Sequence, residues 1–333
     1  MKSEARGLIW CCTFVLLDAA QAVFFGSAFQ RMDSFLVGAC AFGVPTVLGL
    51  AWLAVFDRGQ IETALANGRD LAGLNLTAAG AWLLYLMAIQ LIEPAVAFTI
   101  FSGAIPLAAL MARRFGYPEA PRLRNMAEAL GTAIIFLGLA ALSFSTMAGW
   151  SGFVRGGLAG AVSGVALAGA AGIMISGMLL YSARLDKAGV RPMAQFGLRF
   201  PLYTLLAVGG FLAGLDDKGP VPAGDLAYVF LAGLLLLAFP IYAVQKAVSL
   251  TSTLTIGTFA AIGPLVVFLM QTFEGRVDYA PATLTGLGIY FLGAITATIG
   301  SVRASAARRA GALCAMPDGT RVSTFPVDRS TAP

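Results

Sequence analysis

The sequence predicts an all-α integral membrane protein with ten transmembrane helices, arranged as two inverted repeats of five helices. Three observations lead to this prediction: an apolar composition, ten apolar intervals separated by charged residues, and a motif that occurs twice. Hydrophobic residues make up 58% of the 333 residues, and charged residues make up 12%. Ordinary soluble domains carry about 25% charged residues. A solvated surface therefore cannot cover most of this chain, and its surroundings must be lipid.

Charged residues bound the apolar intervals along the whole chain. The intervals span residues 7–30, 34–56, 71–92, 94–112, 129–154, 156–183, 192–215, 226–245, 247–273 and 279–302. Asp18 interrupts the first interval and Arg199 interrupts the seventh. Because about 20 mostly apolar residues form a helix that crosses the hydrocarbon, each interval predicts one transmembrane helix. The first interval is too long for the apolar core of a signal peptide, and we expect it to be retained.

A duplicated motif divides the ten predicted helices into two halves. FSGAIP (101–106), Glu119 and GTAIIFLGLAAL (131–142) correspond to FAAIGP (259–264), Glu274 and GLGIYFLGAITA (286–297). Residues 136–138 recur as residues 291–293, which is 155 positions later, whereas Pro106 and Pro264 lie 158 positions apart. We predict repeats over residues 1–150 and 151–302, followed by a disordered cytoplasmic tail over residues 303–333. Five helices is an odd number, so the second repeat is expected to enter the membrane upside down.

The distribution of Lys and Arg predicts the orientation. If both termini lie on one side, that side carries 17 of the 22 Lys and Arg residues, the opposite loops carry 4, and Arg199 lies within a span. Cytoplasmic loops are enriched in Lys and Arg, so both termini are expected in the cytoplasm. Glu119 and Glu274 are then turn residues on opposite sides of the membrane. Glu93, at the end of the third predicted helix, is expected to reach the interface.

The residue types present argue against several classes of protein. Histidine is absent, which removes the usual zinc ligand and pH switch. The four cysteines lack the spacing of a metal site. No GxxxxGK[ST] phosphate loop is present, and no nucleophile–base pair of an enzyme can be assembled without histidine. Basic residues form no run with interleaved aromatics. We therefore expect no enzyme, cofactor, metal or nucleic-acid partner.

These features together resemble the drug/metabolite transporter superfamily and, within it, the bacterial EamA-type permeases. The resemblance covers residues 7–302 and is carried by the ten helices, the duplication, and the Pro106/Glu119 and Pro264/Glu274 pairs before glycine-rich fifth helices. It implies a multi-pass protein of the bacterial inner membrane that moves small metabolites, often exporting amino acids or other polar solutes. It also implies a central cavity lined by helices of both halves.

Two ionisable side chains lie deep within predicted spans. An ionisable group there costs about 2.5–3.5 kcal/mol on insertion scales, so each requires a reason. Asp18 lies near the middle of the first predicted helix, and its carboxylate could bind a substrate ammonium or exchange a proton. Arg199 lies near the middle of the seventh, and its fixed positive charge suits a carboxylate or phosphate. The alternative is an Asp18–Arg199 ion pair that holds two helices together.

Helical spacing adds further substrate-binding candidates. Gln21 shares a face with Asp18, while Gln195 and Tyr203 share a face with Arg199. The remaining candidates present hydroxyl groups from other predicted helices: Tyr85, Ser102, Thr255 and Thr258. Backbone hydrogen bonding by the hydroxyls and packing of the aromatic rings are the competing interpretations.

The expected function is that of a secondary transporter with alternating access that exports a small polar or zwitterionic metabolite, such as an amino acid. Opposite charges at Asp18 and Arg199, presented to one cavity, fit the two ends of a zwitterion. The alternatives are a transporter of an anionic metabolite, a membrane-embedded enzyme acting on a lipid or isoprenoid headgroup, and a non-transporting membrane interaction protein. The expected partners are a small-molecule substrate and the lipid bilayer. Coupling to a proton or another ion, and assembly as a homodimer, are both compatible with the sequence.

Overall fold

The fold is all-α. The computed structural model describes residues 2–114, 123, 125–250 and 253–314. Its elements are α1 (Lys2–Arg31), α2 (Ser34–Phe56), α3 (Arg58–Ala66), α4 (Gly68–Leu91), α5 (Pro94–Arg114), α6 (Met126–Met147), α7 (Gly157–Lys187), α8 (Pro192–Leu198), α9 (Pro201–Leu212), α10 (Ala223–Gly233), the π-helix η1 (Leu234–Ala238), α11 (Phe239–Leu250), α12 (Thr253–Glu274) and α13 (Pro281–Cys314). Over these described ranges there is no strand, and one isolated bridge joins Ile92 to Val154.

Six helices are long and apolar enough to cross a membrane. They lie at Arg6–Arg31, Ser34–Phe56, Gly68–Leu91, Met126–Met147, Gly157–Lys187 and Pro281–Ala304. Three shorter apolar helices lie at Pro94–Ala108, Ala223–Leu237 and Phe259–Glu274. The prediction of an all-α protein with apolar, membrane-length helices is therefore confirmed.

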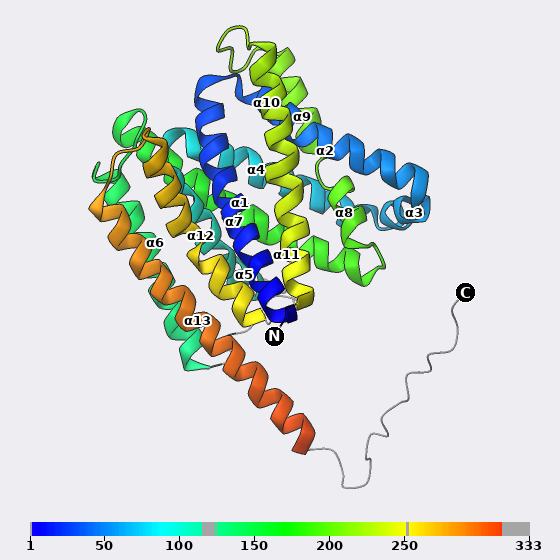
Figure 1. The fold of residues 1–333 in the computed structure, drawn as a ribbon, viewed down its shortest axis with the longest axis vertical. Helices are drawn as coiled ribbons and strands as arrows, with labels where there is room; N and C mark the ends of the chain where they lie inside the picture. The colour runs from blue at the N-terminus through cyan, green and yellow to red at the C-terminus, as the bar shows by residue number, and fades with distance from the viewer. Residues whose placement is uncertain (1, 115–122, 124, 251–252, 315–333) are drawn as a thin grey trace.

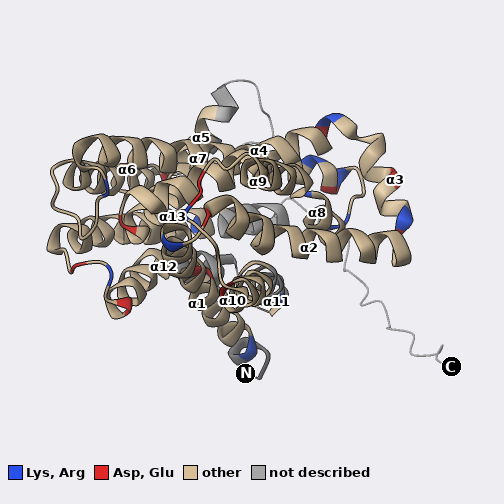
Figure 2. Ribbon diagram, turned by 90° about the horizontal axis from the view of Figure 1, so that it is seen from above, with Lys and Arg blue, Asp and Glu red and all other residues tan. Residues whose placement is uncertain are grey.

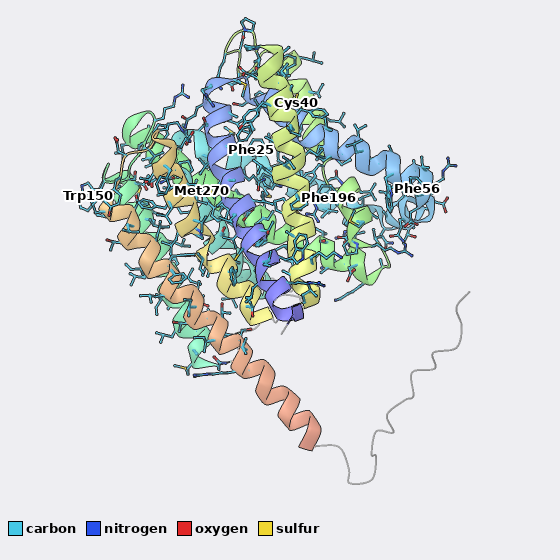
Figure 3. All side chains as sticks on the ribbon, in the orientation of Figure 1. Phe25, Cys40, Phe56, Trp150, Phe196 and Met270 are labelled. Atoms are coloured by element: carbon cyan, nitrogen blue, oxygen red, sulfur yellow. The ribbon has the colours of Figure 1, made fainter. Side chains whose placement is uncertain are left out.

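The exterior fits a lipid environment. Large apolar side chains point outward on many helices; Phe56 is 72% exposed, whereas Phe25 in the interior is 1% exposed (Figure 3). Charged residues lie mainly in turns and near helix ends, and most of the helical surface carries none (Figure 2). A contiguous apolar exterior of this kind is rare on soluble monomers, because it would be left exposed to water.

Two predicted spans depart from a regular α-helix. The interval 192–215 forms α8 and α9, with a break at Arg199 and Phe200 immediately before Pro201. Proline lacks the amide hydrogen and disfavours helical geometry in the preceding residue, which explains the break. The interval 226–245 forms one continuous helix from α10 through η1 to α11 (Figure 1), and the five residues of η1 are a π-helical segment within it.

Two segments differ from the sequence-based expectation. The short helix α3 occupies part of the segment between the second and third predicted spans, which was expected to be a loop. At the other end, α13 continues to Cys314, so helix extends into the predicted disordered tail; residues 315–333 lie outside the described residues. Ala, Arg and Ser in residues 303–314 are compatible with a helix, which the composition-based reading of the tail overlooked. Glu119, part of the predicted repeat motif, also lies outside the described residues.

Helices from the two halves of the chain pack against one another. α4 and α5 pack against α7, α1 packs against α11 and α12, α2 packs against α9, and α6 packs against α13. Figure 1 shows α6 and α13 side by side at one edge of the molecule. The two halves are therefore intertwined and do not form separate bodies.

The α6–α13 contact depends on glycines. A Cβ atom on Gly131 would lie 2.2 Å from the amide nitrogen of Ala297, and one on Gly293 would lie 2.5 Å from that of Ile135. A Cβ atom on Gly138 would lie 2.7 Å from the amide nitrogen of Tyr290, whereas one on Gly286 would lie 2.6 Å from a side-chain methyl group of Leu142. Residue numbers increase along α6 (131, 135, 138, 142) as those of their contacts decrease along α13 (297, 293, 290, 286). The two helices therefore pack antiparallel. Only glycine allows backbones this close.

Candidate functional site

A cavity of about 560 Å³ lies in the centre of the molecule between helices of both halves. Its walls come from α1, α4, α5 and α6 in the first half, and from α7, α11, α12 and α13 in the second. Arg199 and Phe200, at the break between α8 and α9, complete it. The residues that line it include Asp18, Gln21, Trp82, Tyr85, Phe98, Phe101, Ser102, Pro106, Arg199, Phe200, Tyr290 and Thr298.

The helix break fixes the position of Arg199. An interrupted helix leaves backbone groups without their helical partners, and Asn75 of α4 bonds to groups on both sides of this gap. Its side-chain nitrogen donates to the Leu198 carbonyl at 2.8 Å, and its side-chain oxygen accepts from the Leu202 amide at 3.3 Å. Asn75 thereby holds the segment that carries Arg199 against α4. The sequence around position 199 gave no indication that Asn75 would be its partner, because Asn75 lies on a different helix.

Asp18 and Arg199 both line the cavity, but they do not pair with each other. Across the described residues, no ion pair joins the two side chains. The Arg199 guanidinium carbon lies 5.9 Å from the centre of the Phe200 ring, a cation–π contact, and its Nε atom is buried without a hydrogen-bond partner. The ion pair that competed with the ligand interpretation is therefore absent, and both side chains line the cavity without an ion-pair partner among the described residues.

Unsatisfied polar atoms concentrate around the cavity. In the described part of the chain, five buried side-chain polar atoms lack a hydrogen-bond partner: Gln21 Nε2, Tyr85 Oη, Ser151 Oγ, Arg199 Nε and Thr204 Oγ1. Gln21, Tyr85 and Arg199 all line the cavity. An unsatisfied buried donor costs about 1–3 kcal/mol, so three of them around one cavity indicate that a ligand or water completes the bonding. Each of these atoms can donate a hydrogen bond to an anionic or carbonyl oxygen.

Aromatic rings form much of the remaining wall. The ring of Tyr85 lies 4.8 Å from that of Phe101 and 6.0 Å from that of Trp82, measured between ring centres. Phe98, Phe200 and Tyr290 also face the cavity. An apolar cavity with a few convergent polar groups is typical of small-molecule binding sites. Neither Trp82 nor Tyr290 is among the site residues predicted from the sequence.

Two predicted site residues lie away from the cavity. Gln195 is buried, where it donates to the Val190 carbonyl at 2.9 Å and accepts from the Ser182 hydroxyl. Tyr203 is buried with its ring 4.4 Å from that of Phe42, and it lines a separate pocket of about 310 Å³. The shared face predicted for Gln195, Arg199 and Tyr203 assumed a continuous helix. The break at Phe200 changes the direction of the residues that follow, so this grouping requires correction.

Of the predicted hydroxyl-bearing site residues, two line the cavity and one lies away from it. Tyr85 and Ser102 line the cavity. Thr255 is half-buried on α12 and is not part of the cavity wall. Thr258 lies on the same helix, but its side chain is outside the described residues.

Glu93 also differs from expectation. It is fully buried between α4 and α5 and does not reach the interface. Its carboxylate accepts hydrogen bonds from the Gln271 side chain, from the Thr283 hydroxyl at 2.8 Å and from the Gly152 amide at 2.9 Å. The position of Glu93 at a helix end predicted that its carboxylate would extend to the membrane interface. Instead, hydrogen-bond donors from segments distant in the sequence hold it in the interior. Burial raises the pKa of this carboxyl, while the bonds from Thr283, Gly152 and Gln271 act in the opposite direction.

Comparison with known proteins supports the fold but assigns no function. No protein-family model matches the chain, and no curated protein matches it. A solved structure, described only as the crystal structure of a protein, is similar with a TM-score of 0.58 and 20% sequence identity. The similarity covers 90% of this chain and 99% of the other. At that identity the likeness concerns the fold alone.

Proposed function

We propose that the protein is a secondary transporter of the drug/metabolite superfamily, related to EamA-type permeases. It exports a small zwitterionic metabolite, such as an amino acid, across the bacterial inner membrane by alternating access. One observation carries this proposal: among the described lining residues, one acidic and one basic side chain, Asp18 and Arg199, share one central cavity without pairing. An α-amino acid carries the two complementary charges.

Each end of a zwitterion has suitable partners in the cavity. The Asp18 carboxylate accepts from an ammonium group, and the charge-assisted bond is stronger than a neutral one. Arg199 donates to the carboxylate, and its planar guanidinium can form two parallel bonds to it. Gln21 and Tyr85 also line the cavity, each with a buried donor that has no hydrogen-bond partner. The aromatic rings then enclose the apolar part of the substrate.

The proposal includes ten spans in two repeats of five. α1, α2, α4, α5 and α6 form the first repeat; α7, α8–α9, α10–η1–α11, α12 and α13 form the second. Exchanging the repeats maps the α4–α7 contact onto α11–α1 and the α5–α7 contact onto α12–α1. The contacts α2–α9 and α6–α13 map onto themselves. A packing pattern that survives the exchange supports an internal two-fold symmetry.

The α6–α13 contact supports inversion of the second repeat. Gly131 meets Ala297, and the residues 155 positions away from these two, Gly286 and Leu142, also meet each other. The same shift relates the contact of Gly138 with Tyr290 to that of Gly293 with Ile135. Because the helices are antiparallel, the axis that exchanges them reverses the direction of one repeat relative to the other. That is the arrangement of inverted repeats in secondary transporters.

The test is counterflow in proteoliposomes. Vesicles loaded with one unlabelled L-amino acid are expected to accumulate the labelled form transiently, and Tyr85→Phe is expected to raise the half-saturating concentration about 2–10-fold by removing one hydrogen-bond donor. Tyr203→Phe is the matched control, because this ring lies outside the cavity, and its kinetics should be those of the unmodified protein. Exchange of dicarboxylates but of no amino acid would instead favour an anion transporter. Absence of any exchange would contradict transport.

The predicted orientation has its own experiment. A cysteine at Asp217, which is exposed in the α9–α10 loop, should react with a membrane-impermeant maleimide in intact spheroplasts. Cys314, as the single remaining cysteine, should react in inverted vesicles only. Labelling of Cys314 from the periplasmic side would refute both the even number of spans and the inverted repeat. The physical basis is the 17-to-4 distribution of Lys and Arg.

A further inference from the structure

Glu93 is a buried ionisable residue that the substrate site does not use. It lies in the short turn between α4 and α5, is 0% exposed, and has no cationic partner in the hydrogen bonds of its carboxylate. Instead, three donors hold it: the Gln271 side chain of α12, the Thr283 hydroxyl of α13 and the Gly152 amide of the α6–α7 loop. The Gln271 side-chain oxygen accepts in turn from the Ala95 amide at 2.9 Å. A buried carboxylate needs such donors, because none come from water.

These bonds connect two groups of helices. α4 and α5 pack with α7, whereas α12 packs with α1, and α1 packs with α11. The Glu93–Gln271 bond crosses from the first group to the second, and Thr283 adds α13. One further bond crosses at the same end of the bundle, from the Gln30 side chain of α1 to the Ile89 carbonyl of α4 at 3.4 Å. Beside it, Ser34 of α2, a helix outside both groups, donates to Gln90 of α4 at 3.2 Å. This end is therefore closed by polar contacts between the groups.

The cavity lies on the inner side of this closure. Along α13 its wall runs from Tyr290 to Thr298, and along α5 from Phe98 to Pro106, in both cases away from the Glu93 turn. Tyr290 lies seven positions after Thr283, which is about 10 Å along a helix. Fully buried apolar side chains fill this interval, among them Val267 and Leu287. An apolar layer with a polar closure beyond it separates the substrate site from the α4–α5 end.

We infer that Glu93, Gln271 and Thr283 form a clasp that closes one end of the transport path and must break when the cavity opens to that end. The inference rests on the proposed transport function. In the closed state the carboxylate is satisfied by donors from the opposing helices; on opening, water replaces those donors. Weakening the clasp therefore favours the state that is open at this end, while the substrate site remains unchanged.

Gly152 explains why the clasp forms at this point in the chain. A Cβ atom on Gly152 would lie 2.0 Å from the Asp278 carbonyl oxygen, so only glycine allows the loop to pass beside the α12–α13 turn. The Gly152 carbonyl accepts from the Asp278 amide at 3.2 Å, and the Arg155 amide donates to the Leu91 carbonyl at 2.8 Å. The loop thus lies between the two turns, with its amide directed at Glu93.

The experiment measures access to the cavity and needs no substrate. All four native cysteines are replaced, and a single cysteine is introduced at Ala294, a small residue of the cavity wall. A membrane-impermeant methanethiosulfonate reagent is applied to spheroplasts and, separately, to inverted vesicles. With the clasp intact, we expect modification in inverted vesicles and slow modification in spheroplasts. Thr283→Val and Gln271→Leu should each raise the spheroplast rate roughly tenfold, the shift expected when one hydrogen bond to a charged group is lost.

Thr285→Val is the matched control. Thr285 lies two residues from Thr283 on α13, but it is exposed and its hydroxyl bonds only to the Pro281 carbonyl of its own helix, at 2.9 Å. Its spheroplast rate should equal that of the parent. Equal modification rates in the parent, Thr283→Val and Gln271→Leu would contradict the proposed clasp, as would an equal increase in Thr285→Val.

Glu93→Gln replaces any variant that fails to elute as a monodisperse, folded protein, and it should also raise the modification rate in spheroplasts. If access shifts as expected but counterflow is silent, the clasp stands and the transport proposal fails.

Discussion

Asp18→Asn is expected to lower counterflow of the transported amino acid by about 10–100-fold, while the folded protein still accumulates in the membrane. A hydrogen bond to a charged group contributes about 1.5–3 kcal/mol, which corresponds to that range in rate or affinity. Arg199→Gln is expected to have an effect of the same size, because Arg199 contacts the other end of the substrate. Neither change removes a partner from a buried ion pair, since the two side chains do not pair in the structure.

The double variant, Asp18→Asn with Arg199→Gln, separates ligand binding from a structural pair. If the two residues bind the ends of one substrate, the double variant folds and remains inactive. If they stabilised each other instead, each single variant would leave an uncompensated buried charge, at a cost of about 3–5 kcal/mol, and would be lost from the membrane. Recovery of full transport in the double variant would contradict the ligand role. Detergent-solubilised yield and elution profile measure folding independently of transport.

Gly131→Ala is expected to destabilise the protein strongly. The added methyl group would lie 2.2 Å from the Ala297 amide nitrogen, which is backbone and cannot move aside as a flexible side chain can. Overpacking of this kind typically costs about 1–3 kcal/mol. Gly293→Ala, which contacts backbone at 2.5 Å across the same helix pair, should be destabilised similarly. Thermal unfolding of the detergent-solubilised protein provides the measurement.

Gly288→Ala is the control for this pair. Gly288 lies on α13 as well, but an added Cβ atom would meet nothing within 4 Å. Alanine is favoured over glycine in a helix interior by about 0.5–1 kcal/mol, so this variant should be as stable as the parent or slightly more stable. Both substitutions add one methyl group to a glycine. Gly131→Ala is expected to lower the unfolding temperature, whereas Gly288→Ala is expected to leave it unchanged or raise it slightly. Equal unfolding temperatures for Gly131→Ala and Gly288→Ala would refute the close antiparallel packing of α6 and α13.

Much of the fold can be predicted from the sequence because a bilayer imposes local rules. A helix that crosses hydrocarbon must be apolar over a fixed length, so charged residues such as Arg31 and Asp57 mark helix ends directly in the sequence. The same rule singles out Asp18 and Arg199 as candidate site residues, since an ionisable group within a span needs a specific partner. The repeat spacing of 155 residues predicted which positions correspond, and the contacts of Gly131 and Gly286 follow it.

The tertiary structure alone decided which side chains meet. Arg199 faces the cavity because the helix breaks before Pro201 and because Asn75, more than a hundred positions away, satisfies the broken backbone. The same break directs Tyr203 toward Phe42 and away from the cavity. Glu93 has the local context of a residue at the interface, but Gln271 and Thr283, from the other half of the chain, hold it in the interior. Spacing within one helix shows which residues share a face, whereas the neighbour of that face depends on long-range packing between helices.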